Sequence, residues 1–130
     1  MSRPRPKKPG PDRTALPKAL SAAALELIAA RFRMLAEPMR LRLLNELRPG
    51  ERTVTQLIVA TGAGQANISK HLGLLADAGM VARRKDGLNV FYFIADESLF
   101  ELCDLVCSRL QAELAAKAAA FTPETTPARS

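Results

Sequence analysis

Two cysteines, Cys103 and Cys107, stand four residues apart in the stretch ELCDLVC, and they are the only thiols of the chain. Thiolates bind soft metal ions and react with oxidants. Helical residues four apart have side chains about 5–6 Å apart, which is longer than the roughly 3.8 Å between the Cβ atoms of a disulfide. The spacing therefore predicts free thiols that could share a thiophilic ion or a metalloid. Packing is an equally good explanation, because unpaired cysteine is among the most buried residue types.

A second group of side chains suits hydrogen bonding to nucleic acid. It follows the glycine-containing stretch TGAG and precedes an apolar helical pattern. Amides at a helix N-terminus attract phosphate, and Gln, Asn and Ser side chains can bond to base edges. This pattern predicts DNA contacts from the small and polar residues Gln65, Ala66, Asn67, Ser69 and Lys70. The alternative is a solvated helix face without a partner.

Helical periodicity predicts the elements that hold these residues. Apolar side chains recur at three- and four-residue steps over residues 21–36 and 38–47, and they do so again from 96 to about 119. Between the last two of these segments, two shorter helices are expected over 54–61 and 65–78.

Capping signals define the two short helices. Thr53 can cap the first, Gly62 can end it, and Gly64 occupies the cap position of the second. Two short helices joined by a three-residue turn containing glycine are typical of a helix-turn-helix.

A basic hairpin is expected directly afterwards. Residues 80–85 and 88–94 are two expected strands, the second rich in aromatic side chains, and Asp86-Gly87 between them favours a type I′ turn. A hairpin after a helix-turn-helix is the winged-helix arrangement, in which the recognition helix enters the major groove and the wing contacts the backbone. The predicted wing contacts are Arg83, Arg84, Lys85 and Asn89.

The last helix carries an apolar stripe that is too large for a two-layer domain to bury alone. In a symmetric dimer such a face meets its own copy, so pairing through the N- and C-terminal helices is expected. A dimer also presents two recognition helices to half-sites about 34–36 Å apart. The predicted interface comprises Leu25, Ile28, Leu99, Leu102, Cys103, Val106, Leu110 and Leu114.

Length and composition fit one small domain. The chain has 130 residues with 48% apolar content and a net charge of +6. No long uncharged apolar run and no secretory signal are visible, which predicts no membrane partner and a reducing cytoplasmic location. Residues 1–20 hold six basic residues, one acidic residue and five prolines, so we expect a disordered basic arm that attracts phosphate or only aids solubility. The folded domain is expected over 21–121, followed by a flexible tail over 122–130.

The runs EPMRLRLL and TVTQLIVATGAGQANISKHLGLLADAGMVARRKDGLNVFYFI resemble the ArsR/SmtB family of small dimeric winged-helix repressors. The resemblance covers roughly residues 25–114. It implies a mainly α (α+β) winged helix-turn-helix with about five helices and a two-stranded wing. It also implies a homodimer that leaves double-stranded operator DNA when a ligand or oxidant acts. Gln65, Asn67, Ser69 and His71 match positions that the family uses at DNA, and 83–85 match its wing.

Two further basic residues have alternative interpretations. His71, the only histidine, is expected to make a local hydrogen bond or a phosphate contact rather than to bind metal, which needs three or four convergent ligands. Arg40 could reach a phosphate, or it could simply extend its charged end to water from an apolar helix.

The familiar metal sites of the family are not expected here. Thr53-Val54-Thr55 stands where the resemblance implies a Cys-x-Cys pair, and Asp96 has no histidine on its helix to complete a second site. The remaining alternatives are soft-ligand or redox chemistry at the two cysteines, or no small effector. No certain cofactor is predicted.

Catalysis is not expected, because the sequence offers no Ser/His/Asp or Cys/His constellation and no phosphate-binding glycine loop. A winged-helix module that binds protein or RNA is the other class left open. Salt-dependent binding to a palindromic duplex would separate that class from a repressor.

Overall fold

The computed structural model describes residues 19–121, so most of the predicted basic arm and the whole predicted tail lie outside the described residues. Five helices and three strands make up this part of the chain. In order they are α1 (Ala22–Leu35), α2 (Pro38–Leu47), β1 (Arg52–Thr53), α3 (Val54–Thr61), α4 (Gln65–Asp77), β2 (Val81–Asp86), β3 (Asn89–Ile94) and α5 (Ser98–Phe121). The predicted winged helix-turn-helix is confirmed.

Local sequence signals set the helix ends. Pro38 lies in the first turn of α2, where its missing N–H costs nothing. Thr53 forms a capping box with Gln56 at the start of α3, since each side chain accepts a hydrogen bond from the other residue's backbone N–H. Gly62 ends α3 at φ +76°, a left-handed conformation that favours glycine. These residues fix the two short helices.

The core lies where α2, α3 and α4 pack on the sheet and on the start of α5. Its most buried side chains are leucines of the three helices, together with Ile68 and Met80. Leu99 and Phe100 in the first turn of α5 also belong to it. We call α2, α3, α4 and the sheet the body.

The sheet differs from the predicted hairpin in two ways. It has three strands in the order β1-β3-β2, because the two residues of β1 pair with Tyr92 and Phe91. The turn residues are Gly87 and Leu88 rather than Asp86 and Gly87, since Asp86 pairs with Asn89. Only glycines have positive φ in the described chain, so the predicted type I′ turn is wrong. Glycine at the first turn position, φ +65°, is typical of type II′.

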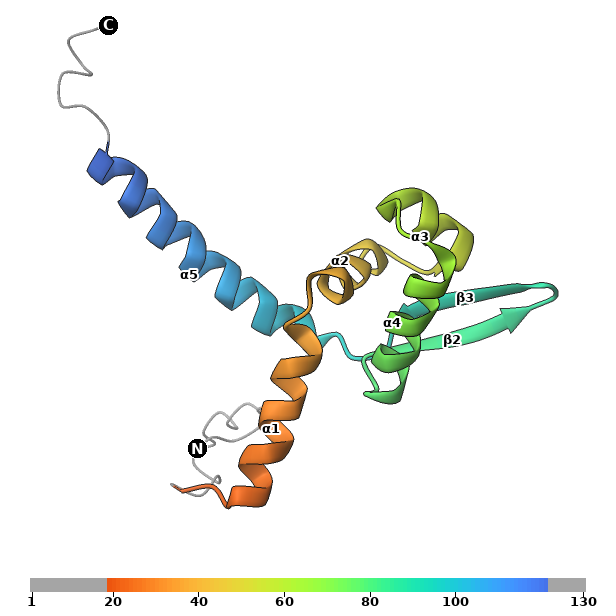
Figure 1. The fold of residues 1–130 in the computed structure, drawn as a ribbon, viewed down its shortest axis with the longest axis horizontal. Helices are drawn as coiled ribbons and strands as arrows, with labels where there is room; N and C mark the ends of the chain where they lie inside the picture. The colour runs from red at the N-terminus through yellow and green to blue at the C-terminus, as the bar shows by residue number, and fades with distance from the viewer. Residues whose placement is uncertain (1–18, 122–130) are drawn as a thin grey trace, which may run out of the picture.

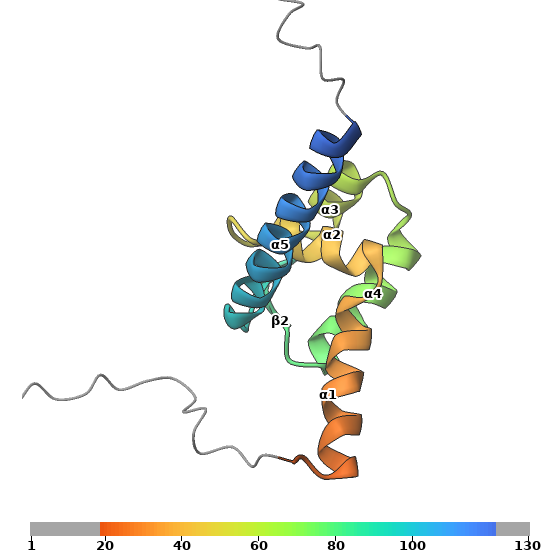
Figure 2. The ribbon, with the colours of Figure 1, turned by 90° about the vertical axis from the view of Figure 1, so that its left-hand side faces the viewer.

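The terminal helices extend away from the body. α1 and α5 leave the same region of the molecule in diverging directions, and the hairpin projects from the opposite side (Figure 1). A view turned by 90° shows α5 in front of the body and α1 extending below it (Figure 2). No helix of residues 19–121 is both long enough and apolar enough to cross a membrane.

Candidate nucleic-acid interface

The N-terminal half of α4 presents one exposed polar face. Ile68 and Leu72 are fully buried and hold the helix on the body. The predicted contact residues of α4 point the other way and are exposed: Gln65, Ala66, Asn67, Ser69 and Lys70. Within residues 19–121 their side chains have no hydrogen-bond partner, and no side chain caps the helix at Gly64. Free amides and unpaired polar side chains therefore face solvent together.

The register of the hairpin divides the predicted wing residues between two faces. Arg83 and Lys85 share a face with Val81, which packs in the core behind α4. Both side chains are exposed and have no ion-pair partner in the described part of the chain. Asn89, the first residue of β3, pairs with Asp86 and therefore lies on the opposite face, where it is also exposed. These three residues are available to a ligand.

Arg84 lies on the other face of the hairpin. Its guanidinium donates to both carboxylate oxygens of Glu51 at 2.9 and 2.6 Å, and it stacks over Phe91 at 4.7 Å. The hydrogen bond from Arg84 lowers the pKa of Glu51, and the same bond raises the pKa of Arg84. This stacking covers part of the second apolar face of the hairpin. Arg84 is therefore committed to a contact within the chain.

His71 is buried on α4 and Arg40 lies on α2, so neither belongs to the exposed face of α4. His71 is 6% exposed, and its Nδ1 lies 3.2 Å from Nη1 of Arg40, whose Nε donates to the carbonyl of Met34 at 2.7 Å. Since a guanidinium can only donate, Nδ1 would be the acceptor in this contact. The pair links α2, α4 and the end of α1 instead of pointing outward.

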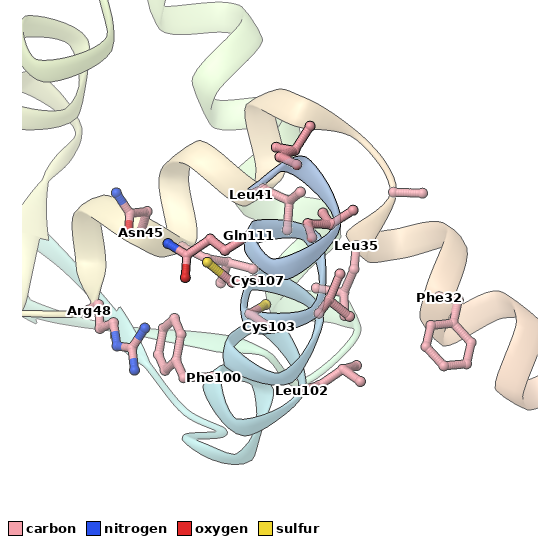
Figure 3. Close-up of a pocket in the computed structure, with 15 residues that line it drawn as sticks. Phe32, Leu35, Leu41, Asn45, Arg48, Phe100, Leu102, Cys103, Cys107 and Gln111 are labelled. Carbon is pink, nitrogen blue, oxygen red and sulfur yellow. The ribbon is translucent and has the colours of Figure 1, made fainter. Parts of the chain in front are cut away.

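An apolar groove of about 760 Å³ runs between α1, α2 and α5. Its lining includes Phe32 and Leu35 of α1, Leu41 of α2, and residues of α5 from Phe100 to Leu114. Asn45, Arg48 and Gln111 are the polar groups at its edge, as Figure 3 shows. Arg48 donates two hydrogen bonds to Asp104 at 3.0 and 2.8 Å, which ties α5 to α2.

Both cysteines line this groove. Cys103 is half-buried and Cys107 is exposed, and both thiols are free, as their spacing predicts. Figure 3 shows the two sulfur atoms on the side of α5 that faces α2. No group of three or more His, Cys, Asp and Glu residues gathers anywhere in residues 19–121. One protomer therefore offers two soft ligands at most.

The predicted dimer residues separate into two sets. Leu25 and Ile28 of α1 and three residues of α5, Val106, Leu110 and Leu114, are exposed. Leu99 is 4% exposed within the core of its own protomer, and Leu102 packs against that core. Leu99 therefore does not offer a surface, because the first turn of α5 closes the body before the helix extends outward. Leu27, Phe32 and Leu105 are exposed and were not predicted, although Phe32 belongs to the same helical repeat as Leu25 and Ile28.

A helix-turn-helix with an exposed polar recognition helix and a partly free basic wing defines a winged-helix nucleic-acid-binding class. The family model for bacterial regulatory proteins of the arsR family matches residues 37–83. A probable mercury resistance operon repressor of Streptomyces lividans is 39% identical over 71 residues, which are 55% of this chain and 57% of that protein. A transcriptional repressor SmtB homolog of Synechocystis is 33% identical over 95 residues, 73% of this chain and 72% of that protein.

One similar solved structure is the homodimeric winged helix-turn-helix DNA-binding domain Mb0332 of Mycobacterium bovis. It has a TM-score of 0.64 and 34% identity, covering 72% of this chain and 86% of that chain. The present chain spans about half the length of the first curated relatives it matches.

The chain belongs to the ArsR family of bacterial regulatory proteins. The predicted resemblance is confirmed, and the family that it indicates is one of transcription regulators, not of enzymes.

Proposed function

We propose that the chain acts as a homodimeric repressor that binds double-stranded operator DNA through α4 and the wing. The observation that carries the proposal is the exposed, unpaired polar face of α4 from Gln65 to Lys70. Small side chains let this face approach the major groove closely, and Gln65 and Asn67 supply donors and acceptors for base edges. Arg83, Lys85 and Asn89 are placed to contact neighbouring phosphates.

A second copy of the chain is the proposed occupant of the surface formed by α1 and α5. Leu110 and Leu114 are 50% and 62% exposed, although they belong to a continuous apolar stripe that begins in the core. A large exposed apolar patch marks an interaction site. The similar Mb0332 domain is homodimeric. Self-pairing of this stripe, with the exposed residues of α1, would place two α4 helices on one palindromic site.

The test is an operator-binding titration with Asn67→Ala. A base-edge contact predicts a loss of about 1–3 kcal/mol on the specific duplex and almost none on a random duplex. Val59→Ala, at an 80% exposed site of α3 outside the predicted contact residues, is the control and should keep the parent's affinity. An Asn67→Ala protein that binds both duplexes like the parent would contradict this role. Tighter binding of the parent to RNA or protein than to any duplex would favour the other winged-helix classes.

We further propose that an effector acts on Cys103 and Cys107. Both free thiols lie on one face of α5 and line one groove between elements of the proposed interface. A thiophilic ion or trivalent metalloid would bridge them after loss of the thiol protons, and the partner copy could supply further thiolates. Such a bridge would alter how α5 packs and thereby lower operator affinity.

Arsenite is a suitable probe for this site. The parent should release a labelled operator as arsenite is added, and Cys103→Ser and Cys107→Ser should each retain it at the same concentration. Ser108→Ala, which leaves both thiols in place, should release DNA like the parent. Peroxide and persulfide form parallel arms that identify an oxidant or reactive sulfur instead. Parent-like release by both cysteine variants in every arm would show that the thiols only pack.

A further inference from the structure

We infer that Arg31 is a positioning residue that couples the two terminal helices to the recognition helix. The inference deepens the proposed function and rests on it, because it assumes that α1 and α5 carry the dimer and α4 the DNA contact. Arg31 lies on α1, far from the exposed face of α4, and was not among the predicted functional residues.

One guanidinium joins three elements. Nη1 of Arg31 donates to the carbonyl oxygen of Ala78 at 2.7 Å, and Nη2 donates to Oδ2 of Asp96 at 2.8 Å. Ala78 is the C-cap residue of α4. Asp96 precedes α5, and its Oδ1 accepts from the backbone N–H and the hydroxyl of Ser98, the first residue of that helix. A shift of either terminal helix therefore pulls on the end of α4.

The chemistry suits this position. The last carbonyls of a helix carry partial negative charge, so a cation at the C-cap of α4 is favourable. The same cation is held by the carboxylate of Asp96. A planar guanidinium can make both contacts at once because its N–H groups diverge from one rigid group. A lysine would supply the charge without this geometry.

Polar contacts supplement the limited apolar packing of α1 on the body. Leu35 is the only residue of α1 that is buried. The other end of the attachment is Arg40, which donates to the carbonyls of Met34 and Arg33 at the end of α1 and faces His71 of α4. Arg31 and Arg40 thus hold α1 and α4 together at two separated points. Small shifts of α1 are transmitted rather than absorbed by loose packing.

The first test compares Arg31→Ala with Arg48→Ala. Each substitution removes one positive charge and one Arg–Asp ion pair. Arg31 pairs with Asp96 just before α5, and Arg48 pairs with Asp104 within α5, but the Arg48–Asp104 pair makes no hydrogen bond to α4. We expect Arg31→Ala to weaken operator binding about tenfold, within the usual range of coupling between sites. Arg48→Ala should weaken it less than about twofold. Both variants should keep the parent's dimer constant within about threefold, because neither arginine is among the predicted interface residues.

A second variant separates positioning from electrostatics by the sign of its effect. Asp96→Asn removes a negative charge, so phosphate attraction alone predicts tighter binding to DNA. Loss of the Arg31 contact predicts weaker binding to the operator, by about fivefold, with no loss on a random duplex. The double variant Arg31→Ala/Asp96→Asn should bind operator no more weakly than Arg31→Ala alone, because both changes remove the same Arg31–Asp96 contact. The salt dependence of binding should keep its slope in every variant, since Arg31 makes no phosphate contact.

The outcomes distinguish the two levels of the argument. Absence of duplex binding or of dimers in the parent overturns the proposed function. If the parent binds operator normally, either of two results overturns the inference alone. One is equal operator affinity of Arg31→Ala and Arg48→Ala, and the other is tighter operator binding by Asp96→Asn than by the parent. A parallel loss on the operator and on a random duplex also overturns it, because that would mean a direct phosphate contact.

Discussion

The body and the two terminal helices of this protein bury their apolar residues in opposite ways. Leu43, Leu57, Ile68 and Leu72 of the body are all at 0% exposure. α1 buries one residue, and α5 buries only Leu99 and Phe100 of its 24 residues. The same residue types thus form a closed core in one region and an open surface in the other. The body is complete within one chain, whereas the terminal helices lack a partner.

This contrast assigns separate tasks to the two regions. A closed core holds α4 rigidly, which a base-reading helix needs. An open apolar stripe can repack, and its groove contains both thiols. The hydrogen bond from Arg31 to Ala78 and the ion pair of Arg48 with Asp104 join the regions without sealing them. The structure therefore separates a closed body, which carries the proposed DNA-reading helix, from an open apolar surface, which is the proposed pairing surface.

The largest expected effect is on the stability of the body. Leu72→Ala leaves a cavity in a fully buried site, so the free energy of unfolding should fall by about 2–5 kcal/mol. Urea denaturation followed by far-UV circular dichroism measures this change. Leu105→Ala on exposed α5 is the matched control and should change the unfolding free energy of the protomer by less than about 1 kcal/mol. Equal losses would mean that the two regions are not packed differently.

The next effect concerns pairing. Leu110→Glu places an unpaired carboxylate in the proposed interface, so the dimer dissociation constant should rise about a hundredfold or more. Sedimentation velocity over a concentration series measures the constant. Val59→Glu adds the same charge at an 80% exposed site of α3 and should leave the constant unchanged. A parent-like Leu110→Glu dimer would show that copies pair through another surface.

A smaller effect tests the two faces of the wing. Lys85 is unpaired, whereas Arg84 is bound to Glu51, so Lys85→Ala should lower the slope of log affinity against log salt by about one unit. Arg84→Ala should leave that slope nearly unchanged. Fluorescence anisotropy at several salt concentrations gives both slopes. The reverse order would mean that Arg84 leaves Glu51 to bind phosphate.

The smallest effect is the pH dependence of the contact between α2 and α5. The hydrogen bond from Arg48 lowers the pKa of Asp104 below its ordinary value of 3.8. As the pH falls, Asp104 is protonated in the unfolded chain near 3.8 and in the folded chain only at a lower pH. The contribution of this pair to stability is therefore fully present above 3.8 and is lost as the pH falls through the folded pKa. Acid titrations of unfolding should therefore be slightly steeper for the parent than for Asp104→Asn. Identical curves would show that the pair does not stabilise the attachment of α5.

Local signals made most of the fold predictable. Pro38, Thr53 and Gly62 act on their own backbone, so helix ends read from them agree with the structure. The short strand β1 was missed, because two residues carry no periodicity and pair only when β3 is already present. The wing turn was predicted one residue too early in the sequence, because the register of a hairpin depends on the pairing of both strands. Contacts across the fold explain each of these differences.

The candidate site was predictable to the same extent. The polar positions of α4 followed from helical spacing alone, and they are exposed. Spacing could not distinguish Arg84 from Lys85, or reveal that Arg40 faces His71, because their partners come from other elements. Asp96 drew attention only as part of a resemblance, and its contact with Arg31 spans 65 residues.

The sequence by itself determined the elements other than β1, the polar face of α4 and the apolar stripe of α5, because each depends on residues a few positions apart. Only the tertiary structure decided which cations are free and which are bound, and which leucines of α5 close the core. It also decided that one guanidinium joins α1, α4 and the start of α5. Those outcomes depend on distances between elements remote in the chain, and no local pattern encodes such distances.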